Sequence, residues 1–120
     1  MKTINLEEKY GKIQGHWHPY IVAELNNNYV KLARLQGEFV WHKHDEEDEL
    51  FVVVAGTLMM DFRDQPTARV SAGEILVVPK GVEHRPWTKG EVKVMLVEPK
   101  STLHTGTTVV DQTVTKLEWI

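Results

Sequence analysis

Three histidines and one glutamate stand at spacings that a single metal ion could collect. His42 and His44 form a His-x-His pair, Glu49 follows five positions after His44, and His84 closes a Pro-Lys-Gly-Val-Glu-His segment further along the chain. Side chains alternate faces along a strand, so His42 and His44 are expected to point the same way and meet one ion. Metal binding is therefore the first hypothesis for this chain.

The position of Glu49 requires a turn before it. An odd separation from His44 would place its carboxylate on the opposite face of one continuous strand. The acidic run 45–48 is therefore expected to turn the chain and return Glu49 on a neighbouring strand. A proline and a glycine shape a tight connection before His84, which we expect to aim this imidazole into the same cavity.

The donor set defines the kind of ion. Three neutral imidazole nitrogens and one carboxylate oxygen suit a divalent transition-metal ion such as Fe, Mn, Ni, Co, Cu or Zn, whereas Ca and Mg prefer all-oxygen shells. In octahedral geometry, positions remain open for water, O2 or a bidentate substrate, as a Lewis-acid or redox catalyst needs. The alternative is a metal-free pocket, because a lone His-x-His pair is a weak signal and histidines often serve as surface or hydrogen-bonded core residues.

Length and composition limit the other possibilities. With 120 residues, 42% of them hydrophobic, the chain is expected to form a single domain with one core. A net charge of -3 argues against nucleic-acid binding, which relies on clustered Lys and Arg, so a small molecule is the expected ligand. Because the chain has no cysteine, any metal must be held by nitrogen and oxygen.

The start of the chain predicts a cytoplasmic protein. Residues 1–9 carry acids where a signal peptide needs an apolar run. No later stretch approaches membrane-spanning length, so no membrane association is expected.

Short β-strands are the elements expected to position these side chains. Residues 1–28 are predicted to be an irregular or partly helical lead-in that ends in a turn at Asn26-Asn27-Asn28, and residues 29–120 one β domain. Many short strands with almost no helical period predict an all-β antiparallel sandwich or barrel. The predicted strands are 29–35, 38–44, 49–55, 58–63, 68–70, 74–78, 83–87, 92–98 and 107–116, with turns between them that include Gln36-Gly37 and Lys89-Gly90.

Two of these strands are apolar on both faces, which favours a closed barrel or a dimer interface. They contain residues 50–55 and 75–78. We expect a homodimer, because a two-fold partner can cover apolar edges and faces. The lead-in 1–28 is long enough to pack on a partner, and residues 2–6 or 107–120 could supply an exchanged strand.

The motif residues resemble the signature of the cupins. The first cupin motif has Gly, five residues, His-x-His, three or four residues, Glu, six residues and Gly; the second has Gly, five residues, Pro-x-Gly, two residues, His, three residues and Asn. This chain departs from them in two places: the first spacing is four residues, and Thr88 replaces the final Asn. The matching residues are Gly37, His42, His44, Glu49 and Gly56, then Gly73, Pro79, Gly81 and His84.

The resemblance implies a fold and a ligand set. It implies a double-stranded β-helix, or jelly-roll barrel, over roughly residues 29–98. It also assigns His42, His44, Glu49 and His84 as the metal ligands. It assigns no reaction, because cupins include sugar isomerases and epimerases, dioxygenases, decarboxylases, polyketide cyclases, sugar-binding regulatory domains and storage proteins.

Three functions remain open at this point. The leading hypothesis is a metalloenzyme that promotes isomerisation, cyclisation or oxygenation of a small oxygenated metabolite. A non-catalytic metal- or metabolite-binding module is the alternative, although a regulatory cupin normally needs an output domain. A largely structural dimer would leave four convergent side chains unexplained.

Residues outside the motifs are assigned more simply. Positions that share strand parity with the motif residues predict a mostly apolar pocket wall. His16 and His18 are expected to lie in a polar loop. His104 could border the pocket mouth as a proton donor or acceptor, with a surface position as the simpler interpretation. The wall positions are Glu38, Val40, Phe51, Val53 and Ala55, and Glu38, Glu83, Arg85 and Lys93 are the acids and bases nearest in sequence to the motifs.

Overall fold

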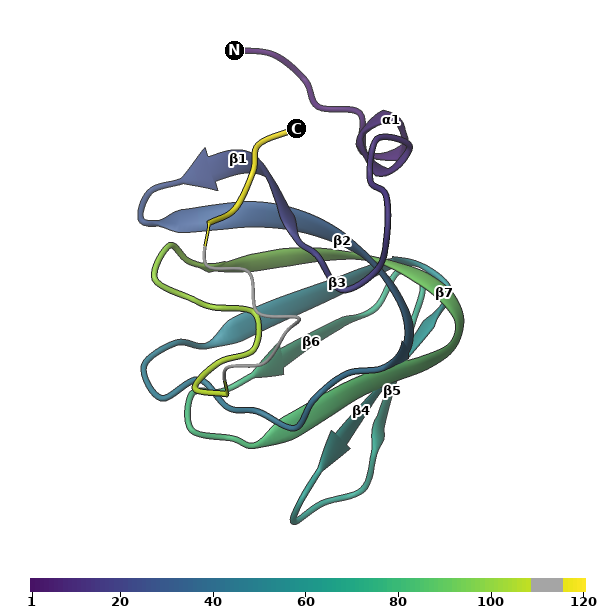
Figure 1. Ribbon diagram of the computed structural model, residues 1–120, viewed down its shortest axis with the longest axis vertical. Helices are drawn as coiled ribbons and strands as arrows, with labels where there is room; N and C mark the ends of the chain where they lie inside the picture. Colours follow the sequence, from purple (N-terminus) through teal and green to yellow (C-terminus); the bar gives the residue numbers. More distant parts are fainter. Residues whose placement is uncertain (109–115) are drawn as a thin grey trace.

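Seven strands and one short helix form the part of the chain that the structure, a computed structural model, describes: residues 1–108 and 116–120 (Figure 1). No helix in these residues is long and apolar enough to span a membrane. In chain order the elements are α1 (Leu6–Tyr10), β1 (Tyr20–Leu25), β2 (Asn28–Glu38), β3 (Glu49–Ala55), β4 (Thr57–Phe62), β5 (Ala68–Ser71), β6 (Ile75–Val78) and β7 (His84–Pro99).

The long strand β7 joins the two layers of the fold. The strands follow the order β1-β2-β7-β3-β6, and every pairing is antiparallel. The last part of β7 lies between β2 and β3, while its first part pairs with β4, which in turn pairs with β5. One strand thus runs through both layers and closes the barrel, which confirms the predicted all-β double-stranded β-helix.

The predicted turn at Lys89-Gly90 is wrong, because β7 continues through it. Leu35 of β2 pairs with Val92, and Gly37 pairs with Thr88, so β2 accompanies β7 on both sides of the bend. Between these two pairs, one residue of β2 faces residues 89–91 of β7, so β7 carries a bulge there. Such a bulge bends a sheet without breaking the ladder, which a composition-based turn prediction does not detect.

The sheet begins earlier than the sequence predicted. Strand β1 lies inside the predicted lead-in and pairs with β2, and α1 precedes it. The asparagine-rich turn is correct in place: Leu25 pairs with Asn28, and Asn26 adopts a φ of 52°. Asn tolerates this left-handed conformation better than most residues, which suits a two-residue hairpin turn.

The predicted strand 38–44 is not formed, although β2 reaches Glu38. Residues 39–48 are irregular apart from one bridge between His42 and His84. Their backbone groups bond to loops instead of a ladder: Gly81 N–H donates to the His44 carbonyl at 2.7 Å, and Thr107 N–H donates to the Lys43 carbonyl at 3.1 Å. The segment crosses from one strand pairing to another, so no single neighbour can hold it as a strand.

Two apolar clusters pack on opposite faces of the sheet formed by β2 and β7. One fills the barrel and includes Val53, Met60 and Val94. The other packs the N-terminal helix region, through Tyr10 and Ile13, on the outer face of the sheet. The lead-in therefore covers its own barrel. Of the predicted strand 107–116, Thr107 and Thr108 are not in a strand, and 109–115 lie outside the described residues.

Candidate metal centre

The structure brings together the four side chains that the sequence singled out. One nitrogen or oxygen from each of them lies within 4.8 Å of the others. His44 Nε2 is 3.3 Å and His84 Nε2 is 3.5 Å from Glu49 Oε1. All four residues are at most 4% exposed. We refer to His42, His44, Glu49 and His84 as the His3Glu cluster.

Strand ends and one irregular segment position this cluster. Glu49 is the first residue of β3 and His84 the first residue of β7. His42 N–H donates to the His84 carbonyl at 3.0 Å, and His84 N–H donates back at 2.9 Å. His42 and His44 therefore converge as predicted, but the backbone bonds of an irregular segment achieve this, and not the alternation of a strand.

Backbone carbonyls orient two of the imidazoles. His42 Nδ1 lies 2.8 Å from the Val40 carbonyl oxygen, and His84 Nδ1 lies 2.9 Å from that of Val82. A carbonyl only accepts, so each Nδ1 carries the proton and each Nε2 keeps its lone pair. This is the arrangement in which histidine binds metals through Nε2.

The unsatisfied atoms of the cluster fit a metal ion. His44 Nε2, His84 Nε2 and Glu49 Oε1 are buried and have no hydrogen-bond partner in the described structure. Buried polar atoms without a partner are rare and costly in folded proteins. Burial, followed by the neighbouring His84, lowers the pKa of His42 to about 4, so its imidazole is neutral near pH 7. Neutral nitrogens and a carboxylate converging in this way could hold a divalent transition-metal ion.

A second buried carboxyl adjoins the cluster. Glu98 is a neighbour of Glu49 and forms a buried ion pair with Lys31, whose Nζ is 2.7 Å from Glu98 Oε1. Burial raises the pKa of Glu49, but the neighbouring Glu98, His44 and His84 side chains outweigh it and hold this pKa well below the usual value. Burial and the neighbouring Glu49 raise the pKa of Glu98 well above its usual value.

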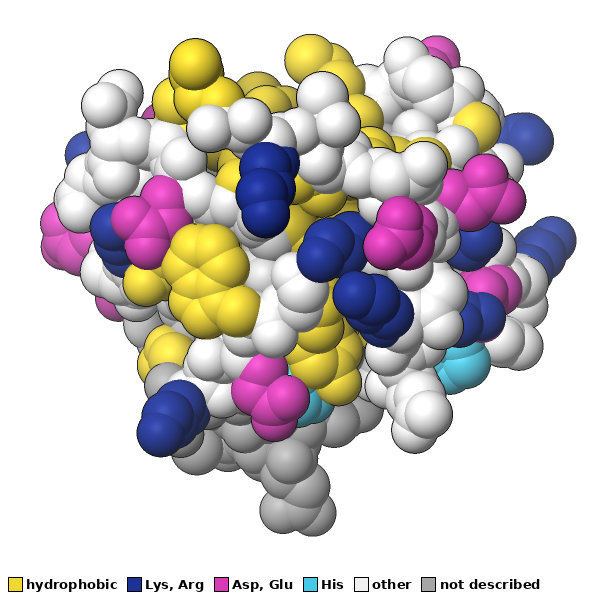
Figure 2. All heavy atoms as spheres, turned by 90° about the horizontal axis from the view of Figure 1, so that it is seen from above, with side chains coloured by type: hydrophobic (Ala, Val, Ile, Leu, Met, Phe, Trp, Pro, Cys, Tyr) yellow, Lys and Arg dark blue, Asp and Glu magenta, His cyan; other side chains and the backbone are white. Residues whose placement is uncertain are grey.

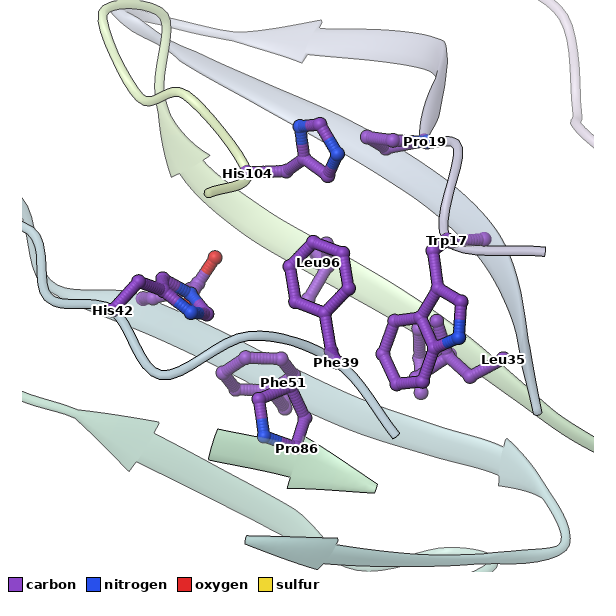
Figure 3. A pocket seen from close by; sticks show the side chains of 12 residues that line it. Trp17, Pro19, Leu35, Phe39, His42, Phe51, Pro86, Leu96 and His104 are labelled. Carbon is purple, nitrogen blue, oxygen red and sulfur yellow. The ribbon is translucent and has the colours of Figure 1, made fainter. Parts of the chain in front are cut away.

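An apolar pocket opens next to the cluster. His42 and Glu49 line one side of it, and the space within is about 410 Å3, part of it open to solvent. Figure 3 shows His42 at one end and Trp17 at the other, with Phe39 between them. The Trp17 and Phe39 rings stack with centroids 4.7 Å apart. The remaining lining residues are Pro19, Ala33, Leu35, Phe51, Pro86, Val94, Leu96 and His104.

Only part of the predicted wall lines this pocket. Phe51 does so, whereas Val53 is buried in the barrel core. The Glu38 side chain is 71% exposed, since residues 39–48 do not continue the strand on which its orientation was predicted. Val40 and Ala55 do not line the pocket.

The charged residues near the motifs are engaged elsewhere. Glu83 pairs with Arg63 at 2.7 Å, and Arg85 pairs with Asp61 at 2.8 Å. Lys93 lies over the Tyr10 ring. None of them lines the apolar pocket.

The other histidines divide into two groups. His16 lies in a surface loop, as predicted, and pairs with Glu91 at 2.9 Å. His18 stacks on Tyr20, outside the His3Glu cluster. His104 is 9% exposed and lines the pocket, so the surface position is wrong and the position at the pocket is correct.

Several residues of the site were not predicted from the sequence. Trp17, Phe39 and Pro19 reach the pocket through loop packing, for which local sequence carries no periodic signal. The positions of Lys31 and Glu98, in contrast, could have been predicted from strand parity. Lys31 shares strand parity with the inward-facing Ala33, and Glu98 shares it with Leu96, so each strand places one charge on its interior face.

Comparisons with known proteins agree with this geometry. The sequence profile of the family described as "Cupin domain" matches residues 29–100. The chain is 44% identical over 66 residues to the uncharacterized protein YdbB of Bacillus subtilis; the alignment covers 55% of this chain and 58% of that protein, which is less than two thirds of its length.

Solved structures extend the likeness to more of the chain. A cupin-2 domain containing protein from Shewanella frigidimarina is 47% identical, with a TM-score of 0.79 over 82% of this chain and 95% of that one. Protein NMB1881 from Neisseria meningitidis is 32% identical, with a TM-score of 0.76 over 82% of this chain and all of that one. Hydroquinone 1,2-dioxygenase from Sphingomonas shares the fold at 17% identity, with a TM-score of 0.76 over 83% of this chain and 32% of that one. The jelly-roll barrel, both sequence motifs and a family match over more than half of the chain show that this protein belongs to the cupin-domain family.

Proposed function

We propose that this cupin binds one divalent transition-metal ion through His42, His44, Glu49 and His84 and acts on a compact, largely apolar molecule that carries an oxygen donor. The proposal rests on the position of the His3Glu cluster beside the apolar pocket. The buried His3Glu cluster contributes His42 and Glu49 to the wall of an otherwise apolar pocket. A substrate could thus be held by apolar contacts while its oxygen reaches the cluster.

The residues of the chain would divide the work. The three imidazoles and the Glu49 carboxylate hold the ion, which when bound supplies Lewis-acid or redox chemistry. Trp17, Phe39 and Phe51 exclude water and pack against the substrate. His104 lines the same pocket and is placed to exchange a proton with a substrate oxygen or carbon.

Isomerisation, cyclisation and oxygenation are the reaction classes that this arrangement supports. Each requires polarisation of a carbonyl, enol or hydroxyl group, and each tolerates an apolar surround. The donor set accommodates Fe, Mn, Ni, Co, Cu or Zn. The choice among these ions separates redox from Lewis-acid chemistry.

A non-catalytic binding cupin is the second candidate. Among the described pocket-lining residues, His104 is the one titratable side chain outside the His3Glu cluster. Catalysis usually needs a positioned acid or base, whereas retention of a metal or metabolite does not. A pocket with few such groups is compatible with binding alone.

A ligand screen on metal-loaded protein tests the proposal. Small enols, diketones and phenols would be added to Co(II)-loaded protein while the visible spectrum, substrate consumption and O2 uptake are followed. We expect at least one class to perturb the spectrum and be consumed. Saturable binding without consumption would select the binding cupin, and no response from a metal-loaded protein would contradict a site that is open to ligands.

The predicted partners are proposed on a separate observation. Val54, Ile75 and Val77 are 38%, 64% and 52% exposed, and the register of β3 with β6 places them on one outer face. We propose that a second copy of the chain covers this face. The net charge of -3 supports a small molecule over a nucleic acid as ligand. On the separate face shown in Figure 2, Lys and Arg side chains are mixed with Asp and Glu side chains. The cytoplasmic location stays a prediction.

A further inference from the structure

A lysine is completely buried inside the barrel beside the proposed metal site. Lys31 is 0% exposed, and its Nζ lies 2.7 Å from Glu98 Oε1 and 3.4 Å from the carbonyl oxygen of Thr102. The Glu98 side chain is also fully buried. Lys is almost never fully buried without a partner, so this pair is a specific feature of the interior.

Stability alone does not account for the pair. Removing two charges from water costs free energy that their attraction rarely exceeds, and apolar residues of similar size often stabilise a fold as well or better. Ala33, Leu35 and Leu96 continue the same interior rows with apolar side chains. A reason for the charges therefore lies in what they contact.

The strand register connects the pair to the His3Glu cluster. Leu50 pairs with Val97 across β3 and β7, so the next position in this register places Glu49 opposite Glu98. Directly opposed side chains on one face of a sheet are neighbours, so the buried carboxyls of Glu49 and Glu98 lie side by side in the interior. On the other side of β7, Tyr29 pairs with Glu98, which makes Lys31 its diagonal neighbour on the interior face.

We propose that Lys31 is a positioning residue for the metal centre: by holding Glu98, it fixes the Glu49 carboxylate toward His44 and His84. This inference rests on the proposed metal site. Lys31 fixes one end of the Glu98 carboxyl, and the other end restricts the orientation of Glu49. Partners that orient a metal ligand in this way typically change metal affinity by about 10- to 100-fold.

Positioning and simple electrostatics predict opposite results. Loss of Lys31 leaves the site more negative, so attraction alone would tighten the binding of a divalent cation. Loss of positioning would weaken binding and change the coordination geometry. The direction of the change in affinity therefore separates the two.

The experiment measures Co(II) affinity by chelator competition, together with the visible Co(II) spectrum, at one fixed pH. We expect Lys31→Met and Glu98→Ala to bind Co(II) about 10- to 100-fold more weakly, with altered spectra. Glu98→Gln should retain the wild-type spectrum, because its amide oxygen can accept from Lys31 while its N–H donates to Glu49. Lys100→Met is the matched control, since it removes a surface lysine that pairs with Glu24 at 3.0 Å.

Each outcome decides a separate point. Wild-type or tighter affinity with an unchanged spectrum in Lys31→Met overturns the inference and leaves the metal site intact. If Lys31→Met does not fold, equal affinities of Glu98→Gln and Glu98→Ala overturn it instead. If wild-type protein binds no Co(II), the proposed metal site itself fails.

Discussion

The Nδ1 atom of His42 lies 2.8 Å from the carbonyl oxygen of Val40. This contact fixes which nitrogen carries the proton, because the carbonyl can only accept. It leaves Nε2 with its lone pair in the part of the cluster where Glu49 and the other imidazoles converge. A substitution at His42 can therefore remove the metal-binding Nε2 while it keeps the hydrogen bond to the Val40 carbonyl.

His42→Asn is expected to retain the fold and lose the metal. The shorter amide can still donate to the Val40 carbonyl but cannot reach the position of Nε2. Metal affinity should fall by about 100-fold or more, since loss of a direct ligand exceeds the cost of losing an outer partner. Chelator competition measures the affinity and urea unfolding the stability. His18→Asn, outside the cluster, should bind metal like the wild type; equal losses in both variants would contradict the assignment.

The metal-free protein should lose stability in acid. The pKa of His42 is about 4 in the folded chain, below its usual value near 6.5, so the unfolded state binds more protons between these values. The contribution is fully present above pH 6.5 and is lost as the pH falls to about 4, for a total of about 3 kcal/mol. Urea unfolding across this range measures it. His42→Asn should show a smaller decrease, and an identical decrease would contradict the assigned shift.

Gly106 should be needed to hold the segment that carries His42. A Cβ atom there would lie 2.1 Å from the Lys43 carbonyl oxygen and 3.3 Å from His42 Cδ2, and the residue has a φ of +60°. Gly106→Ala is expected to lower both the free energy of unfolding and the metal affinity. Gly73→Ala is the control, because Gly73 has a φ of +86° but no atom within 4 Å of its Cβ position.

The control isolates the clash from the backbone strain. Gly73→Ala should cost about 1–2 kcal/mol from its left-handed conformation and leave metal affinity unchanged. Gly106→Ala should cost more, as measured by urea unfolding. Unchanged metal affinity in Gly106→Ala would show that residues 104–108 do not position His42.

The outer face of β3 and β6 should mediate dimerisation. Light scattering at micromolar concentration is expected to give the mass of a dimer for the wild type and of a monomer for the double variant Ile75→Lys, Val77→Lys. Charges in a buried apolar interface are strongly unfavourable. Leu25→Lys, at a residue 58% exposed on β1, is the control and should stay dimeric. A monomeric wild type would contradict the proposed assembly.

Local patterns predicted the fold better than they predicted the site. Short apolar strands predicted an antiparallel sandwich or barrel, and the resemblance of the motifs to those of the cupins implied the jelly roll. The convergence of His42 and His44 was also predicted, but strand parity was the wrong reason, because backbone bonds to His84 and Gly81 hold this segment. Paired spacing in a motif can thus be informative even where the assumed secondary structure is absent.

Long-range packing explains what the sequence did not reveal. Trp17 reaches the pocket from the N-terminal loop, where its N–H donates to the Arg34 carbonyl and its indole to the Gln36 carbonyl. Neither contact leaves a periodic pattern. Near Gly90 the composition predicted a turn, but β7 continues as a bulged strand because β2 pairs with it on both sides. Such features depend on neighbours that are distant in the chain.

Elemental analysis of the untagged protein tests the central claim most directly. Wild-type protein purified from metal-supplemented growth and dialysed should contain about one divalent transition-metal ion per chain. The double variant His42→Ala, His84→Ala should contain almost none, while the matched double variant His16→Ala, His18→Ala should retain the wild-type content. A wild type without transition metal, or a His42→Ala, His84→Ala variant with wild-type content, would contradict the account.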